Sequence, residues 1–305
     1  MDANWETAFT TWSQPPGDSE KSRCENAINA IKSAVSDSYA LRHRSIKSFV
    51  QGSYRNRVDA KAQSDVDVGV LCNDVFLEDY PAGKHRSDFG FVAGSYTFAE
   101  FKNDLGNALV SKFGAASVNR GNKAFNVKNT PLGVEADVVP LFEYRHYWDM
   151  DNYRAGVALI TDNGHRIVNY PERLLDHWPY TPLHYENGVS KNTNTSRAFK
   201  GMVRILKQLR ATMEKGNIVS ASNVPGYLLE CLAYNVPDAA YYPPSWNQRV
   251  EAALNYMWIN TCIDTACNEW TEVDAIKYLF RVGQSWNREQ AFAFVSDARH
   301  YLGIQ

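Results

Sequence analysis

Apolar positions recur along the chain with two different periods, and the change of period divides it into two parts. In the first part, short alternating runs predict β-strands, and stretches with helical spacing lie between them. The predicted strands cover 46–50, 65–70, 115–128, 133–142 and a hairpin at 156–169 with its turn at 162–164. The predicted helices cover 4–12, 19–42 and 97–113. This pattern indicates a mixed α/β structure (α+β) in the first part of the chain.

From residue 195 onward the apolar spacing is helical to the end. The predicted helices cover 195–215, 224–235, 245–259, 269–282 and 287–302. Prolines at 171, 179 and 182 mark irregular chain before this part. We therefore predict an α/β lobe over 1–180, which includes the long helix 19–42, and a helical lobe over 181–305, with a crossing between them at 171–182.

The composition indicates a globular protein without a general affinity for nucleic acid. The chain has 305 residues, 44% hydrophobic content and a net charge of −2, whereas a protein that coats duplex nucleic acid is usually more basic. Its five cysteines are odd in number and irregularly spaced, so a reducing compartment fits. No apolar run is long enough for a signal peptide or a membrane span. We expect a cytoplasmic protein that binds neither duplex nucleic acid nor membranes.

An aspartate pair is the first candidate for chemistry. Asp65 and Asp67 lie two apart in the predicted strand 65–70, so both carboxylates project from one face of a sheet. Two like charges held side by side repel, which suggests a bound cation, and hard oxygen ligands suit Mg²⁺ or Mn²⁺. The alternative for an isolated Asp-x-Asp pair is a solvated strand face. Upstream, Gly52 and Ser53 follow the strand 46–50 where a helix can begin, and backbone N–H groups at a helix start favour a phosphate.

A row of cations is the second candidate. Arg197, Lys200, Arg204 and Lys207 are three, four and three residues apart, so they share one face of the helix 195–215. Such a row repels itself, and an anion opposite would offset the repulsion. The functional interpretation is that part of the row faces a bound anion such as a phosphate group. The structural alternative is a solvated basic face.

The two glycine- and aspartate-bearing segments together resemble a known signature. QGSY at 51–54 followed by SDVDVGV at 64–70 is similar to the signature of polymerase-β-like nucleotidyltransferases. It is most similar to the CD-NTase branch, which holds cyclic GMP-AMP synthase, oligoadenylate synthase and the bacterial enzymes of CBASS anti-phage systems. The likeness runs from about residue 19 to the end of the chain. It implies a nucleotidyltransferase lobe with a mixed sheet, a helical second lobe, and an active site in the cleft between them.

The resemblance also implies roles for individual residues. The family has a third carboxylate on a later strand, which corresponds to Asp137 in GVEADVVP, and Glu135 on the same strand face remains an alternative. Asp65, Asp67 and Asp137 would be catalytic and would bind two Mg²⁺ or Mn²⁺ ions. The implied nucleotide-binding residues are Gln51, Gly52, Ser53, Tyr54, Lys200, Arg204, Lys207 and Tyr227.

The resemblance departs from the family pattern just before Tyr227. The family has Ser-Tyr where this chain has Gly226-Tyr227, so a hydroxyl contact with phosphate is lost or a backbone N–H takes its place. Tyr227 would stack on the base, although a lone tyrosine on a helix is more often part of a core.

The function implied by the resemblance is synthesis of a cyclic di- or trinucleotide second messenger from nucleoside triphosphates such as ATP and GTP. Pyrophosphate would be released, a separate CBASS effector would read the product, and the enzyme is expected to be a monomer. The alternatives are transfer of a single nucleotide to a tRNA, protein or small molecule, a non-catalytic nucleotide-binding module, and an Asp-x-Asp-dependent sugar transferase. A wide basic surface for RNA is not indicated at a net charge of −2, which argues against RNA tailing, and the three carboxylates argue against a decayed enzyme. The upstream Gly-Ser and the helical second half argue against sugar transfer.

Overall fold

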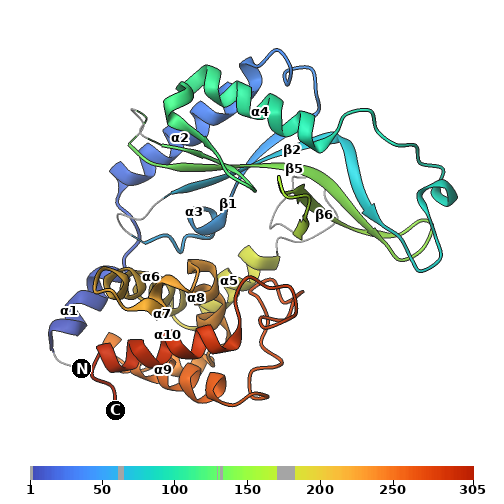
Figure 1. The fold of residues 1–305 in the computed structure, drawn as a ribbon. Coiled ribbons are helices and arrows are strands. Elements are labelled where there is room, and N and C mark those ends of the chain that lie inside the picture. The colour runs from blue at the N-terminus through green and yellow to red at the C-terminus, as the bar shows by residue number, and fades with distance from the viewer. Residues whose placement is uncertain (1–2, 61–64, 129, 131–132, 170–182) are drawn as a thin grey trace. The chain divides into compact units, whose positions relative to one another are not determined.

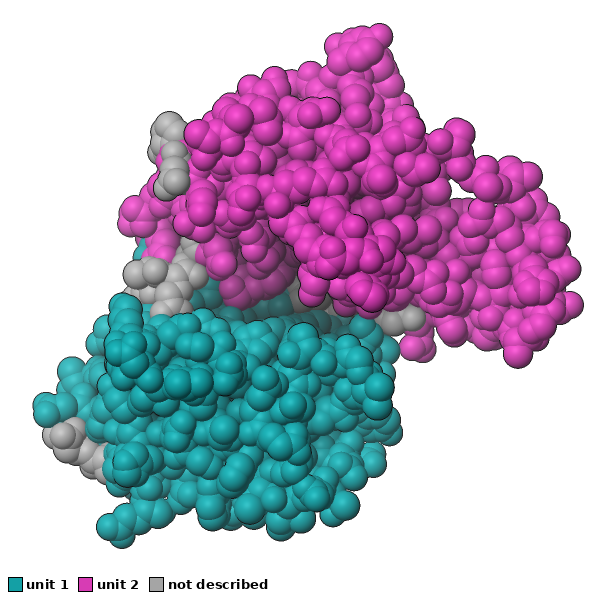
Figure 2. Space-filling model, in the orientation of Figure 1, with its two compact units in different colours: residues 1–17, 56–63, 182–305 teal, residues 18–55, 64–181 magenta. Residues whose placement is uncertain are grey.

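The computed structural model describes residues 3–60, 65–128, 130, 133–169 and 183–305 (Figure 1). The chain forms two compact units, which Figure 2 shows in two colours. The sheet unit is made of residues 18–55 and 64–181. The helical unit is made of residues 1–17, 56–63 and 182–305.

The sheet unit is organised around a seven-stranded mixed sheet. Its strands are β1 (Ile46–Gln51), β2 (Val66–Asp79), β3 (Val118–Arg120), β4 (Phe125–Val127), β5 (Ala136–Tyr147), β6 (Tyr153–Ile160) and β7 (Arg166–Asn169). The order is β1-β2-β5-β4-β3, and β6 pairs with β5 and β7. Only β2 and β5, among the described strands, pair in parallel; the other neighbours are antiparallel.

Two helices, α2 (Asp18–Asp37) and α4 (Phe98–Phe113), pack over one face of this sheet (Figure 1). Along β2 and β5, valines 66, 68 and 138 are fully buried in one hydrophobic cluster with the apolar stripes of both helices. The residues between them, Asp67 and Asp137, are half-buried. Because side chains alternate across a strand, the acidic residues lie on the face that α2 and α4 do not cover.

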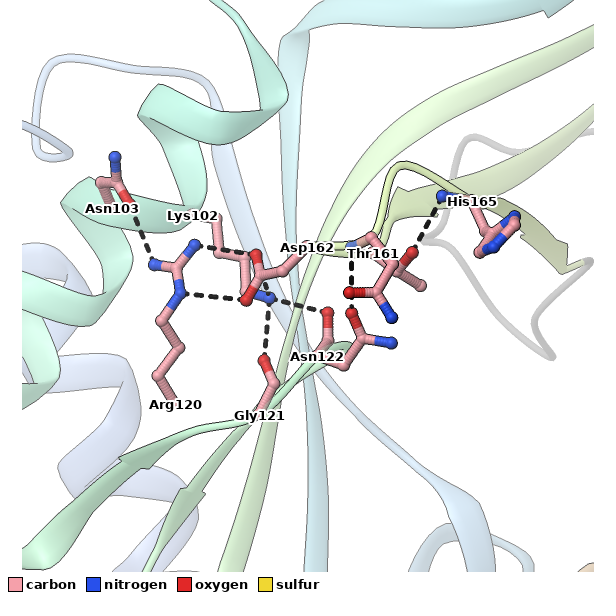
Figure 3. Close-up of polar contacts among 9 residues, drawn as sticks. Lys102, Asn103, Arg120, Gly121, Asn122, Thr161, Asp162 and His165 are labelled. Atoms are coloured by element: carbon pink, nitrogen blue, oxygen red, sulfur yellow. Dashed lines mark hydrogen bonds and ion pairs between the residues drawn. The ribbon is translucent and has the colours of Figure 1, made fainter.

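A buried lysine joins two turns at one end of the sheet unit (Figure 3). Lys102 on α4 is 1% exposed, and its Nζ donates to the carbonyl oxygens of Gly121 at 2.9 Å and Asn122 at 2.8 Å. It also lies 2.9 Å from Asp162 Oδ1, which pairs with Arg120. A buried ammonium needs such partners to offset its lost hydration. The contacts therefore hold the β3–β4 turn against the β6–β7 turn.

The helical unit contains α1 (Ala3–Trp12), α5 (Leu183–Asn194), α6 (Ala198–Lys215), α7 (Val219–Ser222), α8 (Gly226–Asn235), α9 (Trp246–Cys262) and α10 (Arg288–Tyr301). The short helix α3 (Gly52–Asn56) starts in the sheet unit and ends in this one. Helix α6 supplies much of the core, because every residue from Ala198 to Leu206 is buried. Within the described residues, no helix combines the length and the apolar character needed to cross a bilayer.

The N-terminal helix α1 packs with the helical unit, which differs from the predicted division at residue 180. Phe9 is fully buried in the core of that unit, and Trp5 and Trp12 pack against it. Both carboxylate oxygens of Glu6 accept backbone N–H groups at the start of α9, at 2.8 Å from Trp246 N and 2.7 Å from Asn247 N. Aromatic burial and this cap of the helix start explain the placement. The predicted crossing at 171–182 lies outside the described residues.

Two of the predicted helices were wrong in extent or in kind. The helix expected over 19–42 ends at Asp37, where Ser33 and Ser36 hydroxyls bond to nearby groups and short polar side chains compete with the helical backbone. The segment 269–282 is not helical. It folds back on itself through an isolated bridge between Thr271 and Tyr278, so its apolar positions were assigned the wrong period.

Candidate active site

The strand register brings two of the three predicted carboxylates together. Asp67 on β2 is directly opposite Asp137 on β5, and Gln51, the last residue of β1, is directly opposite Asp67 on its other side. Directly opposed residues project from the same face, and neighbouring strands lie about 4.8 Å apart. Asp65 is exposed and comes one residue before β2. The predicted Gln51, Asp67 and Asp137 therefore form one row across three strands.

The register also distinguishes the two candidates for the third carboxylate. Glu135 precedes β5 and is exposed, and its backbone carbonyl accepts the N–H of Val66 at 3.0 Å. Asp137 is half-buried and is the residue opposite Asp67. This geometry supports Asp137 as the partner of Asp67, and it places Glu135 nearer to the level of Asp65.

Gly52 lies directly against the carboxylate of Asp67. A methyl group added at Gly52 would lie 1.9 Å from Asp67 Oδ2, and the backbone there has a φ of +68°. Both the positive φ and the close approach exclude a larger residue without displacement. Ser53 and Tyr54 follow in α3 and are half-buried. The Gly-Ser bend therefore meets the aspartate row, as the spacing of the two motifs predicted.

The carboxylates in this row, together with Asp65 just before β2, are suited to a divalent cation. Asp65, Asp67 and Asp137 offer carboxylate oxygens, the ligands that Mg²⁺ and Mn²⁺ prefer, and all three side chains are at least partly exposed. Across the ranges that the structure describes, no three His, Cys, Asp or Glu side chains are already gathered closely enough to form a metal-binding group. Carboxylates without a cation repel one another, so the cation itself would complete the arrangement.

Two of the predicted cationic contacts, Lys200 and Arg204, are buried in the helical unit. Lys200 Nζ donates to the backbone carbonyl of Asn56 at 2.8 Å. Arg204 donates to the carbonyls of Ser13 at 2.7 Å and Arg57 at 2.8 Å. Burial lowers the pKa of Arg204 to about 10, so it remains charged at neutral pH. These contacts give both cations a structural role, and neither forms the solvated face of the alternative interpretation.

Lys207 and the start of α8 lie together within the helical unit. Lys207 is half-buried, and a methyl group added at Gly226 would be 3.4 Å from Lys207 Cε. Tyr227 follows Gly226, and its hydroxyl donates to Glu272 Oε2 at 2.9 Å. Burial above all raises the pKa of Tyr227 well beyond its ordinary value, so the hydroxyl stays protonated. The structure thus brings Lys207 close to the start of α8, next to Tyr227.

A buried ion pair that the sequence analysis did not identify lies beside Tyr227. His184 Nε2 is 2.8 Å from Glu230 Oε1, and both side chains are buried. Burial alone would raise the pKa of Glu230, but the charges of His184, Lys207 and Lys200 outweigh it and lower the pKa. Glu230 is therefore the internal counter-charge of this cationic region. His184 precedes the part predicted to be helical, and only the fold brings it to Glu230.

Asn126, which lies near the carboxylates, is another residue that the sequence pattern did not identify. It lies on β4 directly opposite Asp137, and its Nδ2 donates to Asp137 Oδ1 at 3.1 Å. A strand of three residues gives too short an alternating pattern to show which of its side chains faces the aspartates. Only the pairing of β4 with β5 identifies this residue.

Comparison with known proteins places the chain in a family. Residues 186–303 match the cGAS/DncV-like nucleotidyltransferase C-terminal helical domain. The cyclic dipyrimidine nucleotide synthase CdnE of Cecembia lonarensis is 38% identical over 95% of each chain. That of Legionella pneumophila is 38% identical over 99% of each chain. The solved structure of Rhodothermus marinus CdnE c-UMP-AMP synthase with Apcpp and Upnpp superposes with a TM-score of 0.79 at 28% identity, covering 98% of this chain and 96% of that one.

These relatives span nearly the whole chain, so the likeness includes both the aspartate row and the helical unit. The expected resemblance and the mixed α/β fold with a helical C-terminal part are confirmed. The chain belongs to the cGAS/DncV-like nucleotidyltransferases, the CD-NTases, and is a nucleotidyltransferase of the cyclic nucleotide synthase type.

Proposed function

We propose that this protein joins nucleoside triphosphates into a cyclic di- or trinucleotide with release of pyrophosphate, as a signal in anti-phage defence. The observation that carries the proposal is the register that sets Asp67 opposite Asp137 with Gly52 against the Asp67 carboxylate. Two relatives at 38% identity are named cyclic dipyrimidine nucleotide synthases, so pyrimidine nucleotides are the first substrates to test. A separate effector would read the product, and the enzyme would act as a monomer.

Asp65, Asp67 and Asp137 would hold two Mg²⁺ or Mn²⁺ ions. Such ions, when bound, neutralise charge on a triphosphate and lower the pKa of an acceptor hydroxyl. Gln51, Gly52, Ser53 and Tyr54 are the residues of the sheet unit proposed to contact the donor nucleotide, with Ser53 on its triphosphate. Gln51, the remaining residue of the row, is uncharged, so the aspartates supply the negative charge that the ions require.

The reaction forms one phosphorus–oxygen bond and breaks another. An acceptor ribose hydroxyl attacks the α-phosphorus of the donor, Asp137 orients this hydroxyl and accepts its proton, and the bond from the α-phosphorus to the bridging oxygen breaks. Pyrophosphate leaves with the electron pair. Lys207 would neutralise the charge that grows on the leaving group, and Tyr227 would stack on a base. A second transfer closes the ring.

The contacts in the helical unit divide its predicted cations into two groups. Lys200 and Arg204 are buried and donate to backbone carbonyls, and Lys207 is more exposed and lies next to Gly226, one residue before Tyr227. We therefore propose Lys207 as the main cationic contact of the nucleotide and treat Lys200 and Arg204 as contributors to its surroundings.

The proposal is tested by incubating the purified protein with each labelled nucleoside triphosphate, alone and in pairs, with Mg²⁺. Mass spectrometry should find a cyclic product formed from nucleotides alone, and the double variant Asp65→Asn, Asp67→Asn should form none. Turnover that persists in this variant would place the active site elsewhere. A product that forms only after addition of tRNA, a protein or a small molecule would indicate single-nucleotide transfer. Calorimetric nucleotide binding without any product would indicate a non-catalytic module.

A further inference from the structure

A row of polar side chains crosses the sheet beyond the predicted carboxylates. Direct pairings connect Gln51 to Asp67, Asp67 to Asp137, Asp137 to Asn126, and Asn126 to Asn119. All five residues therefore project from the same face of five adjacent strands. The two carboxylates at the centre are flanked by amides on both sides. Asn126 and Asn119 thus extend the row beyond the residues that have been given a role so far.

Asn126 is the amide that contacts the carboxylates. Its Nδ2 donates to Asp137 Oδ1 at 3.1 Å and lies 3.5 Å from Glu135 Oε2. A primary amide carries two donor hydrogens and no charge. The amide can therefore hold one oxygen of a carboxylate without forming an ion pair. A positively charged partner in its place would compete with a cation for the same carboxylate. The other oxygen of Asp137 can then face a ligand in a defined direction.

The strand that carries Asn126 is held in place despite its length of three residues. Its neighbours Phe125 and Val127 are 2% exposed and lie in the core on the opposite face. The turn that precedes it is fixed by Lys102, which binds the carbonyls of Gly121 and Asn122 (Figure 3). Asn126 is therefore presented from a buried, doubly anchored strand, which suits a residue that orients another one.

We infer that Asn126 is a positioning residue for Asp137: it fixes the direction of this carboxylate and sets it apart from Glu135, which has only the longer contact. The inference rests on the proposed function, because it assumes that Asp137 serves the transfer reaction. Partners that orient metal ligands contribute about 10- to 100-fold to metal affinity or activity. A loss of that size is the expected effect of removing the amide.

The chain offers a matched control on the neighbouring strand. Asn119 is the same residue type, one strand further along the same row, and is exposed. The test compares Asn126→Ala and Asn126→Leu with Asn119→Leu. Leucine approximates the shape of asparagine without the amide, so it separates hydrogen bonding from packing. Three quantities are measured: the melting temperature, kcat and KM for the nucleotide that wild type turns over, and Mn²⁺ retention.

Mn²⁺ retention is followed by electron paramagnetic resonance in the presence of a non-hydrolysable nucleotide analogue. The inference predicts that both Asn126 variants lose about 10- to 100-fold in kcat with little change in KM, and that both retain Mn²⁺ more weakly. Asn119→Leu should match wild type in every quantity, and the melting temperatures should differ little because the site is partly exposed.

Three outcomes would overturn the inference. These are an Asn126 variant with wild-type kcat, one with wild-type Mn²⁺ retention, and one that loses melting temperature alone while each folded molecule turns over normally. Failure of the proposed function would be recognised differently. In that case wild type itself would form no product, and Asp67→Asn would retain as much Mn²⁺ as wild type.

Discussion

Replacing Gly52 with alanine tests the geometry on which the proposed site depends. The new methyl group would lie 1.9 Å from Asp67 Oδ2 and 2.7 Å from Asp67 Cγ, far inside normal contact distance. Alanine at a φ of +68° costs about 1–2 kcal/mol in backbone conformation alone. In addition, the Asp67 carboxylate must move by about 1 Å or more, and a misplacement of that size costs about 100-fold in rate, or about 2.7 kcal/mol.

The matched control is Gly90→Ala. Gly90 has a φ of +71°, but nothing lies within 4 Å of the position of its new methyl group. Urea denaturation should show a similar loss of about 1–2 kcal/mol in the free energy of unfolding for both variants. Pyrophosphate release should fall about 100-fold in Gly52→Ala and stay near wild type in Gly90→Ala. If Gly52→Ala retained turnover within about threefold of the control, the contact between Gly52 and Asp67 would have no part in catalysis.

Four further substitutions test the side-chain contacts of the helical unit. Lys207→Ala should raise KM for nucleotide about tenfold or more. Lys200→Met should lower the melting temperature and leave KM unchanged, because Lys200 donates to a backbone carbonyl. Equal effects of the two substitutions on KM would contradict this division. Tyr227→Phe keeps the ring but leaves Glu272 without one donor, so the free energy of unfolding, measured with urea, should fall by about 1–3 kcal/mol; an unchanged value would show that the hydrogen bond is not needed. Glu230→Gln should lower the free energy of unfolding by about 3 kcal/mol at pH 7. Because the pKa of Glu230 is lowered from its ordinary 4.5, its contribution is present above that pH and is lost as the pH falls further. Urea titrations of wild type and Glu230→Gln should therefore converge as the pH falls below the ordinary glutamate value of 4.5; a constant difference would refute the charge assignment.

Much of the fold could be predicted because helix and strand periods are local. The helix predicted over 97–113 appears as α4, and the apolar positions from Cys24 to Val35 are buried along α2. The same spacing could not decide what the cations of α6 contact. Lys200 and Arg204 have the spacing of an exposed face, yet both are buried. The backbone carbonyls of residues 13, 56 and 57 accept their hydrogen bonds. Partners so distant in sequence leave no local pattern.

The sequence by itself determined which residues are candidates for chemistry: an Asp-x-Asp pair at the start of a strand, a glycine–serine bend upstream, and a later acidic strand. These depend on residue types and on spacings of a few residues, which neighbouring backbone geometry enforces. Only the tertiary structure decided that Asp137 faces Asp67, and that Asn126 lies opposite Asp137. A shift of one residue in either pairing would turn these side chains to the other face of the sheet. That register is set by packing of buried valines and by anchored turns, whose partners come from distant parts of the chain.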